Sequence, residues 1–449
     1  MADKTSGKAG AGKAGGKAGE PGAVVRIEPR IADIAAADWD AMANPPGVAH
    51  DPFISHAFLK ALEDASTVGP RTGWVPQHLV LEDAPVAGGQ AKAPGETAPV
   101  AGGQAKAPVE TAPVAGGQAK APANAIKGVM PCYVKSHSKG EYIFDYGWAE
   151  AYERAGGRYY PKLQTAVPFT PVPGRRLLVV PDASQALRER QLLAGGIELA
   201  KRVGASSLHL TFLTEGEWQR SGEAGLLQRT DKQFHWHNQG YKTFEDFLSS
   251  LASRKRKAIR KERRDAVEGG LVIERVTGKA ITEAHWDAFF QFYMDTGSRK
   301  WGRPYLNRAF FSHLGTSMPE RCLLVMVRRG DSYIAGALNL IGGDCLYGRY
   351  WGTIDPQPCL HFEVCYYQAI EYAIEHGLAR VEAGAQGEHK LARGYIPQAT
   401  YSVHWIGDEG FRSAVARYLD DERQHMESHR AALAEYAPYR KGDAPPEVE

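Results

Sequence analysis

Apolar residues recur along the chain at spacings that predict two halves of similar plan, with breaks at Gly, Pro and Asp. The first half is predicted to hold helices at 53–65 and 183–204 and strands at 75–82, 126–135, 174–182 and 206–214. The second is predicted to hold helices at 244–267, 284–299 and 361–378 and strands at 322–330, 332–343, 345–352 and 379–386. We therefore expect an α/β (α+β) fold of two tandem units, each a mixed, mostly antiparallel sheet flanked by helices.

Two segments contain too little apolar material to join a core. Residues 1–22 are mostly Gly, Ala and Lys, and PVAGGQAKAP occurs three times within 84–124 with a period of 14 residues. We expect a disordered tail at 1–22 and a low-complexity loop at 84–124, because lengthening a surface loop costs only about 0.6 kcal/mol per doubling. The repeated plan then gives a first unit at 23–230, a second unit at 231–439 and a tail at 440–449.

Composition restricts the function classes. The 449 residues are 24% charged and 43% hydrophobic with a net charge of +2, which fits a globular enzyme and argues against a surface built throughout for nucleic acid. No run reaches the roughly 18 apolar residues of a membrane span. The five cysteines form no CxxC pair, so neither a disulfide framework nor a metal site is indicated. We expect a cytoplasmic protein without a permanently bound cofactor or a DNA partner, able to contact an anionic inner membrane peripherally.

The most unusual stretch is RKRKAIRKERR at 254–264, in which all but three residues are Lys or Arg. The spacing of neighbouring apolar residues predicts a helix whose narrow apolar stripe faces the protein. Like charges four residues apart destabilise a helix, so a bound polyanion would relieve the repulsion. Arg254, Lys257 and Lys261 are therefore candidate ligands of CoA phosphates, a lipid headgroup, a membrane surface or RNA. The alternative is a solvated helix face.

Longer segments resemble a known bacterial family. In the second half these are RTDKQFHWHNQGYKTFEDFLSSLASRKRKAIRKERRDA, GSRKWGRPYLNRAFF, HFEVCYYQAIEYAIEHGL and VEAGAQGEHKLARGYIPQATYSVHW, and in the first half PFISHAFLKALE and AVPFTPVPGRRLLV. They are similar to FemAB-like proteins, which are homologues of the GNAT acyl-CoA N-acyltransferases. Bacterial ceramide synthases are similar to this branch as well. The resemblance implies two GNAT-like units, although the usual GNAT pyrophosphate loop, Q/R-x-x-G-x-G/A, has no good copy here.

The resemblance implies a reaction site in the second half, where the strands at 345–352 and 379–386 diverge. Acyl transfer to an amine needs a base, a polarised carbonyl and a proton for the leaving group. The candidate catalytic residues are His361, Glu363, Glu382, His389 and Tyr395, with Glu382 or His389 as the base. Glu363 has an alternative role as a favourable first-turn acid of its helix. The candidate binding residues are Arg349, Tyr350, Trp351, Gln386, Glu388, Lys390 and Arg393, with Arg254, Lys257 and Lys261 of the basic helix.

Three functions remain open. The leading expectation is an N-acyltransferase that moves a fatty acyl group from acyl-CoA, its co-substrate, to the amine of a lipid-like acceptor such as a sphingoid base. The second is an aminoacyl-tRNA-dependent FemAB-type ligase that acts on a peptidoglycan precursor, with tRNA on the basic helix. The third is a non-catalytic protein that binds RNA or a membrane through this helix.

Overall fold

The computed structural model describes residues 23–83, 125–301, 304–384 and 387–440. The tail predicted at 1–22, the loop predicted at 84–124 and nearly all of the tail predicted at 440–449 lie outside these residues. Among the described residues, no helix is long and apolar enough to cross a bilayer. In the same part of the chain, no group of three or more His, Cys, Asp and Glu side chains is arranged to hold a metal ion.

The first half of the described chain contains nine strands and five α-helices. Its strands are β1 (Ala23–Glu28), β2 (Trp74–Pro76), β3 (His78–Asp83), β4 (Ile126–Met130), β5 (Tyr133–Lys135), β6 (Lys162–Thr165), β7 (Leu178–Val179), β8 (Ser207–Leu213) and β9 (Leu227–His237). Its helices are α1 (Ala36–Ala43), α2 (His56–Asp64), α3 (Tyr146–Arg154), α4 (Gln185–Arg202) and α5 (Glu215–Glu223).

The second half of the described chain contains six further strands. These are β10 (Leu271–Thr277), β11 (Cys322–Arg329), β12 (Ser332–Ile341), β13 (Cys345–Thr353), β14 (Arg380–Glu382) and β15 (Ile396–Ile406). The helices are α6 (Phe244–Ser250), α7 (Ser253–Ala266), α8 (Glu283–Trp301), α9 (Arg308–Ser317), α10 (Leu360–Phe362), α11 (Gln368–Glu375) and α12 (Glu409–Ala434). A π-helical turn, η6 (Glu363–Tyr367), joins α10 to α11, and a 3-10 segment, η7 (Glu388–Arg393), precedes β15.

The described strands form two sheets. The smaller sheet has the order β1-β3-β4-β7, and the larger has the order β10-β11-β12-β13-β14-β9-β15-β8-β6-β5-β2. Within the larger sheet, β13 pairs with β14 and β6 with β8 in parallel, and the other pairings are antiparallel. The predicted fold class, with mixed and mostly antiparallel sheets flanked by helices, is therefore confirmed.

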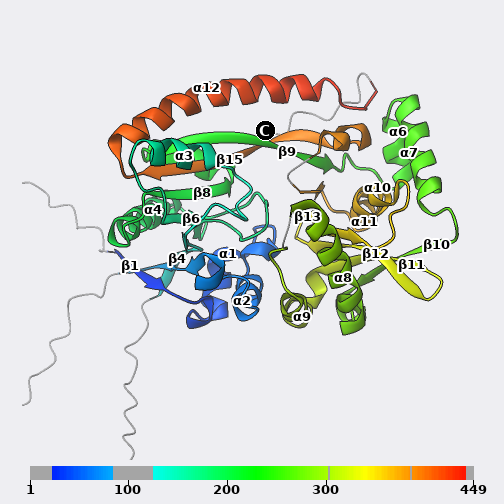
Figure 1. Cartoon of the computed structure of the whole chain (residues 1–449), viewed down its shortest axis with the longest axis horizontal. Helices are drawn as coiled ribbons and strands as arrows, with labels where there is room; N and C mark the ends of the chain where they lie inside the picture. Colours follow the sequence, from blue (N-terminus) through cyan, green and yellow to red (C-terminus); the bar gives the residue numbers. More distant parts are fainter. Residues whose placement is uncertain (1–22, 84–124, 302–303, 385–386, 441–449) are drawn as a thin grey trace, which may run out of the picture.

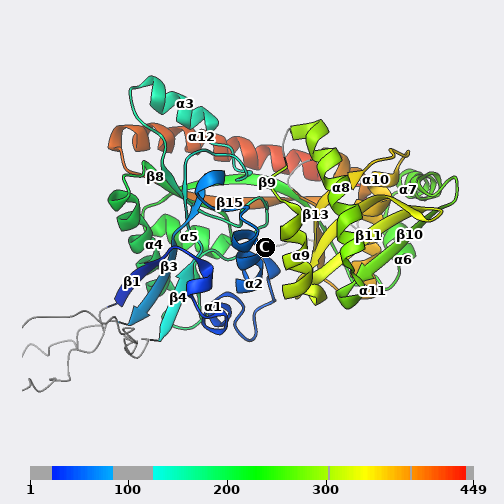
Figure 2. The ribbon, with the colours of Figure 1, turned by 60° about the horizontal axis from the view of Figure 1, so that its bottom comes forward.

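The larger sheet runs through both halves because strands cross between them. β15 pairs with β8 of the first half and with β9, and β9 also pairs with β14. Figures 1 and 2 show α12 lying along β9 and β15 across the two halves. Aromatic contacts add to the junction: the rings of Phe53 and Tyr347 are 5.1 Å apart, and those of Phe58 and Phe310 are 5.8 Å apart. The two halves therefore share a sheet and part of a core.

Two predicted strands are each divided between the sheets. The segment predicted at 75–82 forms β2 in the larger sheet and β3 in the smaller one, and the segment predicted at 126–135 forms β4 and β5 likewise. Pro131 follows β4, and a proline has no N–H to continue a ladder. Opposite this break, the Gln77 N–H donates to the Cys132 carbonyl oxygen at 2.8 Å.

Other predicted elements are wrong in extent. The helix predicted at 244–267 is two helices, because Leu251 is extended and the Ala252 N–H donates to the Pro438 carbonyl oxygen at 2.9 Å. The strand predicted at 174–182 is reduced to β7, and the helix predicted at 361–378 contains the π-helical turn. The prediction omits several elements that the structure contains, including β1, β9, β10, β15, α1, α3, α5, α9 and α12.

Candidate functional site

The fork between β13 and β14 is the starting point for the site. The two strands pair over Cys345–Tyr347 and Arg380–Glu382, and β13 then continues beside β12 to Thr353. The divergence expected from the sequence is therefore present. Glu382 is the last residue of β14, and Arg349 follows the paired part of β13.

Glu382 is held by cations at this fork. Its carboxylate accepts hydrogen bonds from Arg349 Nη2 and from Arg380 Nε, each at 3.3 Å. The side chains of Glu382 and Arg349 are each 2% exposed. Burial alone would raise the pKa of Glu382, but His235, Arg380 and Arg349 together hold it below its usual value. Glu382 is therefore a fixed anion that orders Arg349, and it is poorly suited to accept a proton.

Residues of the first half complete this cluster, and the sequence prediction missed them. The Phe53 ring lies 5.0 Å from the guanidinium carbon of Arg349. Asp51 caps the turn at Pro52–Ile54 by accepting a hydrogen bond from the Phe53 N–H at 2.9 Å. Burial raises the pKa of Asp51 to about 6, although this hydrogen bond and Arg176 oppose the rise. The Asp-Pro pair signals a turn, but no local pattern relates it to a strand so far along the chain.

Segment η7 places two neighbouring residues in opposite environments. His389 is exposed, and its Nε2 lies 2.8 Å from the hydroxyl of Tyr366 in the π-helical turn. Lys390 is buried and donates from Nζ to the Gly384 carbonyl oxygen at 2.8 Å. Burial, with Arg349 nearby, lowers the pKa of Lys390 to about 7. Because π-helical turns are rare and frequent at functional sites, the contact with Tyr366 favours a functional role for His389.

Aromatic rings fill the space between η7 and the π-helical turn. The His361 ring is 5.5 Å from Trp351, 5.3 Å from Tyr366 and 6.3 Å from His389. The Tyr366 ring is also 5.5 Å from Tyr395, which is fully buried. Within the described part of the chain, the Tyr395 hydroxyl has no hydrogen-bond partner. The structure thus brings together four of the predicted residues: His361, Trp351, His389 and Tyr395.

Glu363 instead has a structural partner. Its carboxylate accepts hydrogen bonds from Arg263 of α7 at 2.9 and 3.0 Å, and from Gln368 Nε2 at 2.7 Å. The Glu363 side chain is 3% exposed and that of Arg263 is 25% exposed. A carboxylate in a two-point pair with a guanidinium is not free to take a proton. The geometry therefore favours a structural role for Glu363 through its pair with Arg263, which differs from the first-turn role given as the alternative above.

The basic helix α7 borders a surface hollow, here called the α7 hollow. It has a volume of about 370 Å³ and is lined by Arg254, Lys255, Ala258, Ile259, Glu262, Ala392 and Arg393. Arg254, Lys257 and Lys261 are exposed, which fits both a polyanion-binding face and a solvated helix face, so their binding role stays a prediction. Lys261 approaches Asp265 at 3.6 Å, whereas Arg254 and Lys257 form no ion pair within the described residues.

Two other predicted binding residues are engaged in internal contacts. Arg393 donates to Glu262 at 2.8 and 3.2 Å, and its guanidinium lies 3.4 Å above the Phe362 ring. The Tyr350 hydroxyl donates to the Phe169 carbonyl oxygen at 3.1 Å and so joins the two halves. Gln386 lies outside the described residues, so its role stays a prediction.

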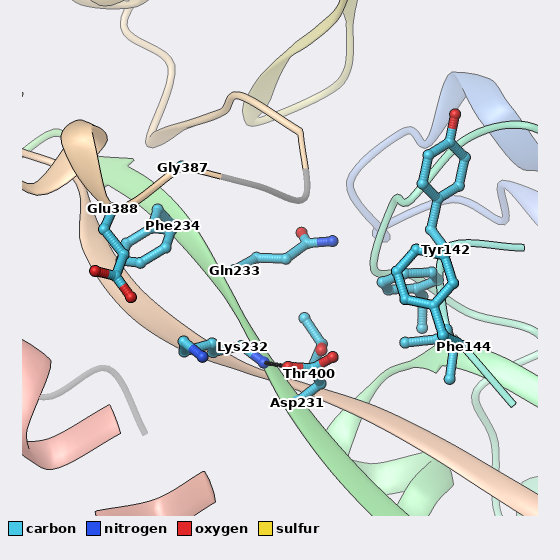
Figure 3. A pocket seen from close by; sticks show the side chains of 11 residues that line it. Tyr142, Phe144, Asp231, Lys232, Gln233, Phe234, Gly387, Glu388 and Thr400 are labelled. Atoms are coloured by element: carbon cyan, nitrogen blue, oxygen red, sulfur yellow. Dashed lines mark hydrogen bonds between the residues drawn. The ribbon is translucent and has the colours of Figure 1, made fainter. Parts of the chain in front are cut away.

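A second hollow, here called the β9 pocket, was not predicted. Its volume is about 250 Å³, and it is lined by Tyr142, Ile143, Phe144, Phe212, Asp231, Lys232, Gln233, Phe234, Gly387, Glu388 and Thr400 (Figure 3). Tyr142 and Phe212 have positive φ angles of 62° and 60°. Non-glycine residues rarely adopt this backbone, and such strain is concentrated at functional sites. His389 follows the β9 pocket residues Gly387 and Glu388 and precedes the α7 hollow residues of η7.

A buried charge cluster fixes one wall of the β9 pocket. Lys162 Nζ donates to Glu141 at 2.7 Å and also bonds Asp145, and Lys135 approaches Glu141 at 3.7 Å. Burial lowers the pKa of Lys135 to about 7, whereas Glu141 and Asp145 raise the pKa of Lys162 in spite of its burial. The two carboxylates flank Tyr142–Phe144, so the lysines hold this wall in place. The sequence signal that could have indicated this wall is the density of Tyr, Trp and His at 135–160.

The family assignment agrees with the motifs of the sequence. The FemAB-like family model, described as peptidoglycan biosynthesis/recognition, matches residues 30–94 and 115–441. The chain belongs to the FemAB-like family. The resemblance inferred from the sequence is confirmed at this level, while the finer similarity to ceramide synthases is not part of what the match shows. A comparison with curated proteins finds no match.

Several solved structures are similar to this chain in part. FemX is 13% identical with a TM-score of 0.49, over 85% of this chain and 98% of that one. A tandem GNAT protein from the clavulanic acid biosynthesis pathway is 10% identical with a TM-score of 0.39, over 86% and 98% of the two chains. L-PGS from Bacillus licheniformis is 9% identical with a TM-score of 0.41, over 57% and 82%.

The leading functional expectation from the sequence is wrong. Fatty acyl transfer from acyl-CoA to a sphingoid base does not agree with a family described by peptidoglycan biosynthesis and recognition. The match supports the second expectation, the FemAB-type ligase, instead. The coarser prediction of a transferase-type enzyme agrees with this family.

Proposed function

We propose that the chain is an aminoacyl-tRNA-dependent ligase that adds an amino acid to an amine of a peptidoglycan precursor. The FemAB-like match over residues 30–94 and 115–441 carries this proposal. FemAB relatives include ligases that use charged tRNA as the donor, which supplies the donor class. The arrangement of η7, α7 and the β9 pocket supports the proposal as a site for two substrates.

The reaction is an attack of the acceptor amine on the ester carbonyl carbon of the charged tRNA. A C–N bond forms and the ester C–O bond breaks. The amine loses a proton to a base, and the departing ribose oxygen gains one. An alkylammonium has a pKa near 10.4 in water, so a protein base or a water chain is needed at neutral pH.

His389 is the proposed base. It is exposed, whereas Glu382 is buried and held by two arginines and Glu363 by a third. The hydroxyl of Tyr366, 2.8 Å from Nε2, orients the imidazole. In sequence, His389 lies between residues that line the β9 pocket and residues that line the α7 hollow. A base at this position could meet an amine from one hollow and the ester of the charged tRNA from the other.

The α7 hollow is the proposed site for the phosphates near the acceptor end of the tRNA. Arg254 lines this hollow and Lys257 follows it on α7, and both side chains are exposed without ion-pair partners among the described residues. When such cations contact nucleic-acid phosphates, the counterions condensed on the nucleic acid are released, and this release favours binding. The proposal therefore explains why a helix carries so many like charges on its solvent face.

The donor side can be tested with the purified protein, tRNAs charged with labelled amino acids, and a precursor whose stem peptide carries a side-chain amine. We expect discharge of the tRNA that depends on the acceptor, with the label recovered in the peptide. Discharge that does not require the acceptor would indicate plain ester hydrolysis and contradict the proposal. Tight RNA binding with no discharge of any charged tRNA would favour the non-catalytic alternative.

A further inference from the structure

The β9 pocket contains a buried polar atom that lacks a partner. Thr400 is 2% exposed and lines the pocket, yet within the described residues its Oγ1 makes no hydrogen bond. Leaving a buried hydroxyl without a hydrogen-bond partner is unfavourable, because the hydroxyl has lost its hydrogen bonds to water. A ligand with a donor or acceptor group in the pocket would satisfy it.

An acidic residue stands beside this hydroxyl. Asp231 of β9 is the direct cross-strand partner of Thr400 of β15, so the two side chains share one face of the sheet, and Figure 3 shows both at the pocket. Asp231 Oδ1 accepts a hydrogen bond from the Lys232 N–H at 2.7 Å. Within the described part of the chain, Asp231 forms no ion pair. The carboxylate therefore brings an uncompensated negative charge to the pocket.

The cation next to Asp231 in sequence does not neutralise it. The Lys232 ammonium points toward α12, where Nζ lies 3.4 Å from His429 Nδ1 and 3.9 Å from Met426 Sδ. Glu388, a second acid at the pocket, comes within 4.0 Å of His429 but is 63% exposed. The balance of charge that faces the pocket is therefore negative.

The other walls are aromatic. Tyr142, Phe144, Phe212 and Phe234 line the pocket, and Phe144 is 54% exposed at its edge. The faces of aromatic rings attract cations electrostatically. A carboxylate, a hydroxyl and several aromatic rings together suit a primary ammonium group on an aliphatic chain.

We propose that the β9 pocket binds the primary ammonium group of the acceptor, with Asp231 as its counter-ion, Thr400 as a hydrogen-bond partner and the rings around its aliphatic stem. This inference rests on the proposed function for the role of the ammonium group as the acceptor. The preference for an ammonium group follows from the residues that line the pocket. Gly387 and Glu388 of the pocket directly precede His389, so the bound ammonium is delivered beside the proposed base.

One face of β9 connects the pocket to the fork. Asp231, Gln233 and His235 alternate along the strand and so point to the same side. His235 Nε2 lies 3.3 Å from Gln233 Oε1, and His235 is the cross-strand partner of Glu382. The polar row therefore runs from the ammonium pocket to the Glu382–Arg349 pair.

The test is a binding measurement without tRNA. The probes are Nα-acetyl-lysine N-methylamide and its norleucine counterpart, which has a methyl group in place of the amine. We expect the full-length protein to bind the lysine derivative at least about tenfold more tightly, with Asp231→Asn losing about tenfold or more and Thr400→Val about threefold to tenfold. Asp421→Asn, an exposed acid on α12, is the matched control and should change nothing.

A stability measurement separates ligand binding from folding. Thr400→Val removes an unpaired buried hydroxyl, so we expect the ligand-free variant to unfold at an equal or higher temperature while it binds the probe more weakly. Equal binding of the lysine and norleucine probes, or unchanged binding in Asp231→Asn, would overturn the proposal. Amine-selective binding that persists while transfer from charged tRNA fails would contradict the proposed function and leave this pocket assignment intact.

Discussion

His389 and Lys390 are adjacent, yet their surroundings give them different chemistry. His389 faces solvent with its ring oriented by Tyr366, while Lys390 is enclosed and hydrogen-bonded to the Gly384 carbonyl. Sequence alone identified both as candidates, because titratable residues after two glycines exceed what a turn requires. It could not distinguish their roles, since exposure and partners depend on the π-helical turn and on Arg349, which are distant in sequence.

His389→Gln should lower kcat by about 10²–10⁴ with little change in KM, because a base acts in the transition state. Tyr366→Phe should lower kcat by about tenfold through loss of ring orientation, since the hydroxyl contacts the proposed base. Steady-state rates of aminoacyl transfer measure both. The control is His425→Gln, an exposed histidine on α12. A His389→Gln enzyme within about threefold of the parent rate would exclude this role.

The lowered pKa of Lys390 leads us to expect that the stability of the folded protein depends on pH. Its pKa is about 7 in the folded protein, below the value near 10.5 of the free side chain. Between these values the unfolded chain binds more protons, so the free energy of unfolding rises with pH, by at most about 1.4 kcal/mol per pH unit from this group. Lys390→Met should reduce that rise in urea unfolding from about pH 7 to about pH 9, whereas exposed Lys201→Met should not. Equal slopes in all three proteins would refute a lowered pKa.

At the scale of elements, the spacing of apolar residues predicted helices and strands that have their own apolar pattern. It missed elements whose stability depends on strands distant in sequence. The basic helix was predicted from its narrow apolar stripe, and the strands β11 to β13 from apolar runs bounded by Gly and Asp; β11, for example, is buried on both faces of the sheet. β9 was missed because its first residues carry charged and polar side chains on both faces, and α12 because its buried apolar residues are few: Val415, Leu419 and Leu433. Both elements are stabilised by partners from the other half, which the sequence pattern does not contain.

Salt dependence tests the role of α7. Neutralising Arg254 and Lys257 together should weaken tRNA binding and reduce the slope of log K against log salt by about two, because each phosphate contact contributes about one. Filter binding or fluorescence anisotropy over a series of salt concentrations measures this slope. Lys201→Ala with Arg202→Ala, an exposed basic pair at the end of α4, is the control. An unchanged slope in the α7 variant would show that tRNA binds elsewhere.

At the scale of the whole molecule, the site is formed where the two halves meet. Asp51 and Phe53 of the first half lie against Arg349 and Glu382 of the second, and β9 and β15 join their sheets. The expected boundary between 230 and 231 falls inside β9, Leu227–His237. The sequence indicated two similar units, but an exchange of strands between them has no local signature, so it could not be predicted.

The shared sheet predicts joint unfolding. We expect the intact chain to unfold in one cooperative transition, because β15 needs β8 and β9 as neighbours. Residues 23–230 and 231–440 made separately should lack a cooperative transition in urea, followed by circular dichroism. A fragment that unfolds cooperatively at the midpoint of the intact protein would show that the halves are independent.

The most direct test of the proposed ligase activity is the mass of the acceptor after incubation with charged tRNA. We expect a stem-peptide acceptor to gain the mass of one amino-acid residue, and the same peptide with norleucine in place of its amine-bearing residue to gain none. An acceptor of unchanged mass with every charged tRNA, under conditions where the protein is folded and binds tRNA, would contradict the assignment of this chain as an aminoacyl-tRNA-dependent ligase.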